Sequence, residues 1–201
     1  MTDHPKRKRS RRVALVLAGA AVLATAACKE EQTEARAFPD LESCLQAADN
    51  GSLWFTADDC RTQFAAAQEN YAETAPRYDG LALCEQEHGA GNCQPDPSAQ
   101  QSGGGGSIFM PLLMGYMIGS MLGGRGATSQ PLMRNASGGY ATPAGQSFAS
   151  NNGAGRVATN TFNRAPATAG RPPMSAAQVQ SRGGFGASRT STAPARTSSG
   201  G

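Results

Sequence analysis

Residues 107–122 read SIFMPLLMGYMIGSML, and the chain after them is rich in Gly, Ala, Ser, Thr, Pro and Arg. At 100° per residue, the methionines of this stretch share one face of a helical wheel and its spaced glycines share the opposite face. We therefore expect an apolar Met/Gly helix over residues 108–123. The residues expected to make its contacts are Met110, Met114, Gly115, Met117, Gly119, Met121 and Gly123.

The chain that follows this helix has little apolar surface to cover it, so the stripe predicts an interaction element. Its apolar run of about 15 residues is shorter than a membrane span. The helix would dock on the chain's own domain or a partner protein, lie in a lipid surface, or self-associate through its glycines. An alternative is that the methionine thioethers bind Cu(I), although methionines at helical spacing are more often packing residues.

The N-terminus has the pattern of an export signal. KRKRSRR (6–12) precedes the apolar stretch VALVLAGAAVLATAA (13–27), and Cys28 follows directly. As a helix this stretch would span about 22 Å, which is less than the roughly 30 Å of a bilayer core. A signal peptide over residues 1–27 therefore fits better than a membrane anchor.

The stretch ATAAC (24–28) resembles a bacterial lipobox, in which small residues precede the cysteine that is cleaved and acylated, although Thr25 stands where leucine is usual. We expect Cys28 to be the first mature residue and to carry acyl chains such as palmitate, which give durable membrane attachment. Lys29 is not the aspartate of an inner-membrane retention signal, so the predicted location is the outer membrane, facing the periplasm. An ordinary secretory signal is the alternative.

Four further cysteines predict two disulfides in an oxidising compartment: Cys44, Cys60, Cys84 and Cys93. Two similar stretches, FPDLESC (38–44) and YDGLALC (78–84), each lead into a cysteine that a second cysteine follows. In each of two related units, the first cysteine would form a disulfide with the second. This repeat predicts the pairs Cys44–Cys60 and Cys84–Cys93.

The sequence gives no sign of a catalytic, metal or cofactor site. Close cysteine pairs of the C-x-x-C kind, which zinc and redox sites use, are absent. After signal removal His88 is the only histidine left to serve a cysteine nucleophile, and EHGAGNC (87–93) is more typical of a helix end with a glycine cap. We expect a protein that is not an enzyme, with thiol- or Met-dependent metal or redox handling as the alternative.

Helical patterns are confined to the cysteine-containing region. We expect helices near 40–50, from Asp40, near 59–74, with Asp58 as N-cap, and near 80–88, ending at Gly89. Trp54 and Phe55 are expected to cap their core, with a binding surface as the alternative. The fold class is thus a mostly α, small disulfide-stapled helical domain, because so small a core needs covalent support.

Charge divides the chain into three blocks. Residues 1–27 carry six basic groups and one acid, residues 28–101 carry four basic groups and 14 acids, and residues 102–201 carry eight arginines and no acid. The last block has no hydrophobic period and predicts a long disordered region. Its sparse arginines are read as a solvated tail, with binding to an anionic envelope polymer or lipid as the alternative.

TAPRYDGLALC (74–84), GNC (91–93), FMPLLMGYMIGSMLGG (109–124) and RGGFG (182–186), in this order after a lipobox, resemble the YgiB-like lipoproteins of Gram-negative bacteria. The resemblance covers most of the chain and implies envelope localisation but no activity. We expect a membrane contact through the lipid anchor and an envelope protein partner, with no nucleic acid and no small-molecule substrate. The expected parts are a signal peptide (1–27), an acidic tether (28–37), the helical domain (38–97), a Gly-rich linker (98–107), the Met/Gly helix (108–123) and a disordered basic tail (124–201).

Overall fold

The computed structural model of the chain describes residues 31–51, 54–101, 107–120 and 127–182. The signal peptide and Cys28 lie outside these described residues. Contacts separate residues 1–31 from a unit of residues 32–201, and every helix and strand described here belongs to the second unit.

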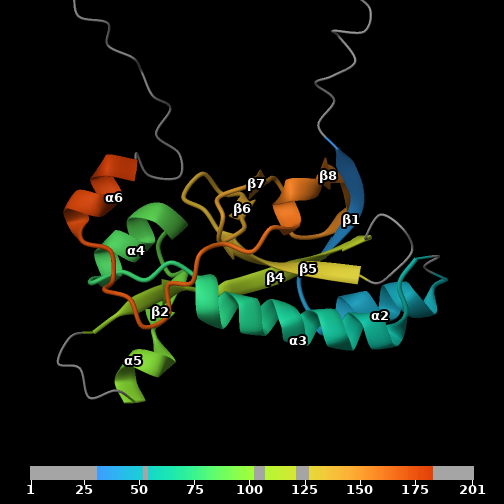
Figure 1. Ribbon diagram of the computed structural model, residues 1–201, viewed down its shortest axis with the longest axis horizontal. Helices are drawn as coiled ribbons and strands as arrows, with labels where there is room; N and C mark the ends of the chain where they lie inside the picture. The colour runs from blue at the N-terminus through green and yellow to red at the C-terminus, as the bar shows by residue number, and fades with distance from the viewer. Residues whose placement is uncertain (1–30, 52–53, 102–106, 121–126, 183–201) are drawn as a thin grey trace, which may run out of the picture. The chain divides into compact units, whose positions relative to one another are not determined.

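Six antiparallel strands form a curled sheet in the order β7-β6-β5-β4-β1-β8 (Figure 1). They are β1 (Gln32–Phe38), β4 (Leu113–Ser120), β5 (Ala127–Arg134), β6 (Tyr140–Ala141), β7 (Ser147–Phe148) and β8 (Gly153–Ala158). The first strand is internal, because Ala35 lies opposite Gly119 of β4 on one side and Gly155 of β8 on the other. β1 therefore joins distant parts of the chain, whereas β4 to β7 pair in sequence order.

The predicted mostly α fold is wrong, because the described residues form a mixed α and β structure around this sheet. The predicted helix over 108–123 is also wrong, since its central part is β4. Gly115 and Gly119 lie four residues apart, a spacing that fits one face of a strand as well as one face of a helix. Each glycine inside a helix would cost about 1 kcal/mol, whereas β4 is supported by pairing with β1 and β5.

Helices α2 (Leu41–Asp49) and α3 (Ala57–Thr74) lie along one face of the sheet, and α4 (Leu81–His88) follows them (Figure 1). Asp40 caps α2 as predicted, since its side chain accepts a hydrogen bond from the Ser43 backbone N–H. Asp58 is not the cap of α3. Thr56 is, in a capping box in which Thr56 and Asp59 satisfy each other's backbone N–H groups.

Shorter elements complete the described structure. They are β2 (Cys93–Pro95), which pairs with β3 (Phe109–Pro111), the helices α5 (Pro97–Gln101) and α6 (Ala176–Arg182), and the 3₁₀ helix η2 (Thr159–Phe162). The predicted linker 98–107 thus begins inside α5, and the predicted tether 28–37 contains most of β1. Both segments had been predicted to lack regular structure because of their polar and Gly-rich composition.

The two faces of β4 belong to different apolar clusters. Tyr116 and Ile118 are fully buried with Phe38 against α2 and α3, where Trp54 and Phe55 also pack, as predicted for a capped core. Met117 faces the opposite side and packs with Leu132 of β5. A strand that is apolar on both faces lacks the alternation by which a strand is recognised in a sequence.

The predicted disordered tail over 124–201 is wrong for residues 127–182, which form β5 to β8, η2 and α6. A buried ion pair holds part of this segment: Arg77 Nε lies 2.6 Å from an Asp96 carboxylate oxygen, and Arg77 Nη1 donates to Thr168 Oγ1. Thr168 in turn donates to the Ala75 carbonyl. The two contacts of Thr168 join residues 91 and 93 positions apart, so no local sequence pattern predicts them.

Candidate functional site

The predicted interaction residues do not form one exposed surface. Met110 and Met117 are buried in separate clusters, and Met114 is half-buried in β4. Met121 and Gly123 lie outside the described residues. The stripe that suggested thioether binding of a metal therefore has no counterpart among the described methionines.

The predicted glycine face serves packing inside the domain. Gly119 lies beneath the ring of Phe162, so close that an added Cβ would stand 2.3 Å from the ring. Gly115 has φ +144° at a bulge in β4, and a Cβ there would stand 2.6 Å from the Phe38 carbonyl oxygen. These glycines allow close packing between elements of the same domain, whereas the sequence predicted close packing against a neighbouring helix.

The four described cysteines are paired as predicted, Cys44 with Cys60 and Cys84 with Cys93. The first pair joins α2 to α3, and the second joins α4 to β2. No thiol of these four cysteines is left to act as a nucleophile or a metal ligand.

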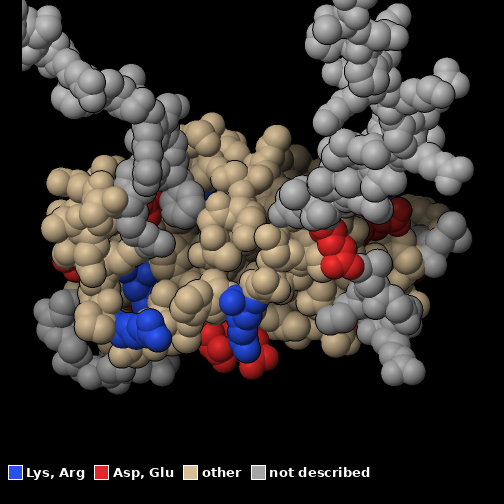
Figure 2. Space-filling view, turned by 45° about the horizontal axis from the view of Figure 1, so that its top comes forward, with Lys and Arg blue, Asp and Glu red and all other residues tan. Residues whose placement is uncertain are grey.

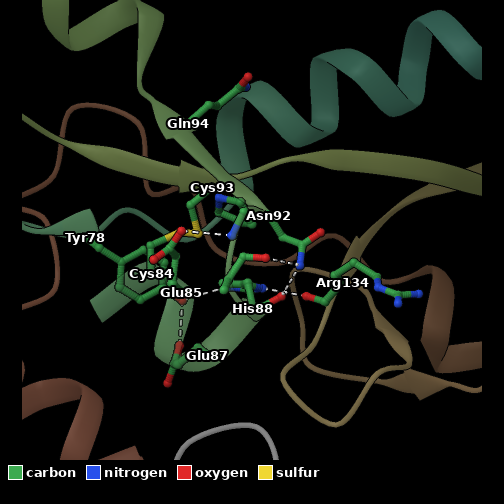
Figure 3. The surroundings of a disulfide bond; sticks show 12 residues. Tyr78, Cys84, Glu85, Glu87, His88, Asn92, Cys93, Gln94 and Arg134 are labelled. Carbon is green, nitrogen blue, oxygen red and sulfur yellow. Dashed lines mark hydrogen bonds between the residues drawn. A yellow bond between two sulfur atoms is a disulfide. The ribbon is translucent and has the colours of Figure 1, made fainter. Parts of the chain in front are cut away.

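A polar cluster lies beside the second disulfide (Figure 3). The Tyr78 hydroxyl lies 2.5 Å from Glu87 Oε2 and 2.8 Å from His88 Nε2, and His88 Nδ1 lies 2.6 Å from the Arg134 carbonyl oxygen. Burial lowers the pKa of His88, against the opposing effects of the Arg134 carbonyl and Glu87. Because the hydroxyl has one proton, it can donate to only one of its two partners, and the other contact needs a proton that belongs to Glu87 or His88.

This cluster is structural in its present form, because Tyr78, Glu87 and His88 are each at most 1% exposed. It joins α4 to the end of β5, and the Glu87 carbonyl accepts a further hydrogen bond from the Ala136 N–H. A substrate would have no path to these groups. In the sequence, His88 was considered as a catalytic base and judged more typical of a helix end. No sequence pattern predicted its contact with Arg134.

An accessible groove lies on the opposite side of the domain's sheet from α2 and α3. Its volume is about 250 Å³, and Ala35, Ala37 and Met117 line it from the sheet. Phe148 of β7, part of the loop between β7 and β8, and residues 153–157 of β8 complete its walls. Since most of these side chains are apolar, the groove suits contact with a polypeptide or another apolar group better than catalysis.

Strand β8 borders this groove and ends the sheet. β1 pairs with one of its edges, and no described strand pairs with the other. Neither feature is predictable from the sequence, because residues 153–158 read GAGRVA, which has a composition typical of loops. The only pair of residues in this stretch with appreciable strand preference is Arg156-Val157.

The described ranges lack a membrane-spanning helix and a cluster of metal-binding side chains. No helix there is long and apolar enough to cross a membrane. Within the same ranges, no group of three or more His, Cys, Asp or Glu side chains is arranged to hold a metal ion.

Comparison with known proteins places the chain in a family. A family model described as a protein of unknown function, DUF1190, matches residues 32–195. A UPF0441 protein of Erwinia tasmaniensis is 33% identical over 184 residues, covering 87% of this chain and 79% of the relative. One from Serratia proteamaculans is 32% identical, covering 90% and 83%. No solved structure matches the chain.

The chain therefore belongs to the DUF1190 or UPF0441 family, which confirms the predicted YgiB-like family. The family description names no activity, so it assigns no reaction to the chain. The matched region begins at the first residue of β1 and includes every element of the sheet.

Proposed function

We propose that this protein is a lipid-anchored component of the cell envelope with an accessory, interaction role, and that it is not an enzyme. The anchor is the acylated thiol of Cys28, and three residues separate this cysteine from the first residue of β1 at Gln32. The folded domain would be held close to the membrane, since each extended residue adds only about 3.5 Å.

The observation that carries this proposal is the pairing of all four remaining cysteines in the domain that follows the export-signal pattern. Disulfides of this kind persist in oxidising compartments such as the periplasm and are rare in the cytosol. Cys44, Cys60 and Cys84 are fully buried, which favours a structural role over a redox role.

Two rival functions have less support. Metal or redox handling needed free thiols or an exposed methionine stripe, and neither occurs among the described cysteines and methionines. Polymer binding would draw on the arginines of the predicted tail, two of which are engaged within the domain. Arg134 donates a hydrogen bond to Tyr140 and stacks on its ring, and Arg164 pairs with Glu73 at 2.9 Å.

The proposal is tested by mass spectrometry of the mature protein purified from membranes. We expect the N-terminal peptide to begin at acylated Cys28 and the unreduced protein to show no free thiol. A Cys28→Ala variant should leave the membrane fraction. A chain that starts elsewhere without lipid, or that carries reduced cysteines, would refute the anchored function.

A Lys29→Asp variant is a matched control for sorting, because it keeps the acylated cysteine and changes only the residue after it. We expect this variant to remain in the membrane fraction but to move from the outer to the inner membrane. Retention of both variants in the outer membrane would argue against a lipid anchor at Cys28.

A further inference from the structure

We propose that β8 and the groove beside it bind an extended polypeptide segment of a partner protein, which adds to the sheet as a seventh strand. The proposal rests on the interaction role proposed above and names the chemistry of the partner. The segment would carry small apolar side chains toward the groove and a carboxylate near Arg156.

The backbone of β8 provides the first argument. Along an unpaired edge, alternate residues direct both N–H and C=O outward, where an extended chain can take up the hydrogen bonds. β8 is six residues long, whereas β7 at the opposite end of the sheet has only two. The longer edge therefore offers enough backbone for specific pairing.

The small side chains of β8 do not cover this edge. Gly153, Ala154, Gly155 and Arg156 are all exposed, and a Cβ added at Gly153 or Gly155 would meet no atom within 4 Å. Strands at sheet edges are commonly protected by lysines, prolines or covering loops. β8 contains no lysine or proline.

The groove gives the added strand a surface for alternate side chains. Gly155 lies opposite Ala35 and Gly153 lies opposite Ala37, so small residues line the part of the sheet next to the edge. Met117 and Phe148 lie further in. Side chains of modest size, such as valine or alanine, would fit above the glycines and reach the apolar floor.

Charge supports a carboxylate in the partner. Arg156 is the only charged residue of β8, and because successive side chains of a strand alternate between the two faces, it points away from the face that Ala35 and Ala37 share with the groove. It forms no ion pair with a described residue, although Glu34 lies opposite it on β1. Figure 2 shows that charged residues occur in few places on the face of the domain that it presents.

The test uses the full mature chain in solution and a capped, fluorescein-labelled peptide that alternates valine and threonine around one aspartate. Fluorescence anisotropy should show saturable binding of this peptide. The same peptide with alternate amides N-methylated cannot donate to the edge and should not bind. Amide hydrogen exchange should slow in β8 when the first peptide is added and not when the second is added.

A Gly155→Lys variant should weaken binding by about tenfold or more, because a lysine on an edge blocks pairing. The added positive charge would attract the aspartate peptide, so a loss of affinity separates edge blocking from simple charge attraction. Ala169→Lys adds the same charge at an exposed site outside the groove and should bind like wild type. Gly155→Ala should also bind like wild type and shows that the position tolerates a side chain.

An Arg156→Ala variant should weaken binding about two- to fivefold at low salt, the range expected for an exposed ion pair. The proposal fails if the peptide does not bind, if both lysine variants behave alike, or if β8 amides are already protected in the free protein. The last outcome, with a dimer seen by sedimentation, would mean that a second copy occupies the edge. None of these results depends on acylation of Cys28, so they are independent of the test of the anchor.

Discussion

The disulfide-bonded helices and the curled sheet are held together over very different distances along the chain. Cys44–Cys60 and Cys84–Cys93 join residues 16 and 9 positions apart. In the sheet, β1 pairs with β4 and β8, which begin at Leu113 and Gly153. Local closure stabilises the helices by restricting the unfolded chain, whereas the sheet forms only when distant segments meet.

The two regions share one core, so neither is independent. Phe38 at the end of β1 lies 5.6 Å from Phe55 and 5.8 Å from Tyr116, measured between ring centroids. This aromatic cluster joins the loop before α3 to the centre of the sheet. We expect substitutions where the helices meet the sheet to lower the stability of the domain more than the loss of a disulfide or a helix cap.

The largest loss is expected for Gly115→Ala, at the point where β4 meets the end of β1. An added Cβ would clash with the backbone at Phe38, and φ +144° is unfavourable for any residue with a side chain. We expect destabilisation of about 3 kcal/mol or more, measured by urea unfolding. Gly155→Ala in the same sheet meets open space and should change stability by about 0.5 kcal/mol or less. Equal effects would contradict this account of Gly115.

Replacing both Cys44 and Cys60 with alanine should cost about 3 kcal/mol, because a closed loop of this length restricts the unfolded chain by about that much. Hydrogen exchange should rise more in α2 than in β4, since the bond tethers α2 directly. Uniform acceleration through both elements would show that the helices and the sheet open as one unit.

Tyr78→Phe should cost about 2 kcal/mol, because it removes the hydroxyl from two buried partners, Glu87 and His88. Glu87→Gln should cost less than Tyr78→Phe, since its amide can donate to the Tyr78 oxygen while the hydroxyl donates to His88. Thermal or urea unfolding would give both values.

Tyr116→Phe is the matched control for Tyr78→Phe. Both tyrosines are fully buried, but the Tyr116 hydroxyl has no hydrogen-bond partner among the described residues. Burial raises the pKa of Tyr116, with a smaller contribution from Asp40. Removing this hydroxyl should be neutral or stabilising, and a loss as large as that of Tyr78→Phe would contradict the difference between the two sites.

Apart from the control variants, the smallest loss of stability is expected at the start of α3. Thr56→Ala removes the capping side chain and should cost about 1 kcal/mol. Asp58→Ala should cost about 0.5 kcal/mol or less, because Asp58 is exposed and pairs only with Arg61 at the surface. The reverse order would restore the sequence-based choice of Asp58 as the cap.

Features that depend on neighbouring residues could be predicted from the sequence, and features that depend on distant segments could not. The starts and ends of α2 and α4 and both cysteine pairs were predicted, because caps, periodicity and repeats operate within a few residues. The cap of α3 was misplaced by two residues, since Thr56, Asp58 and Asp59 all favour a helix start.

The failures lie where distant segments decide the structure. β4 was read as a helix because Met and Gly spacing fits two periods, and only pairing with β1 and β5 selects the strand. The candidate groove was missed because its residues come from β1, β4, β7 and β8. No window of sequence contains the groove.

The sequence by itself determined the family, the disulfide pairs, the start of α2, the end of α4 and the export-signal pattern, all of which depend on residue types at short or fixed spacing. Only the tertiary structure decided that the apolar stretch is a strand, that most of the Gly- and Ala-rich half folds, and that β8 forms an open edge. The physical reason is that a strand gains its hydrogen bonds from partners elsewhere in the chain, whereas a helix makes them within itself.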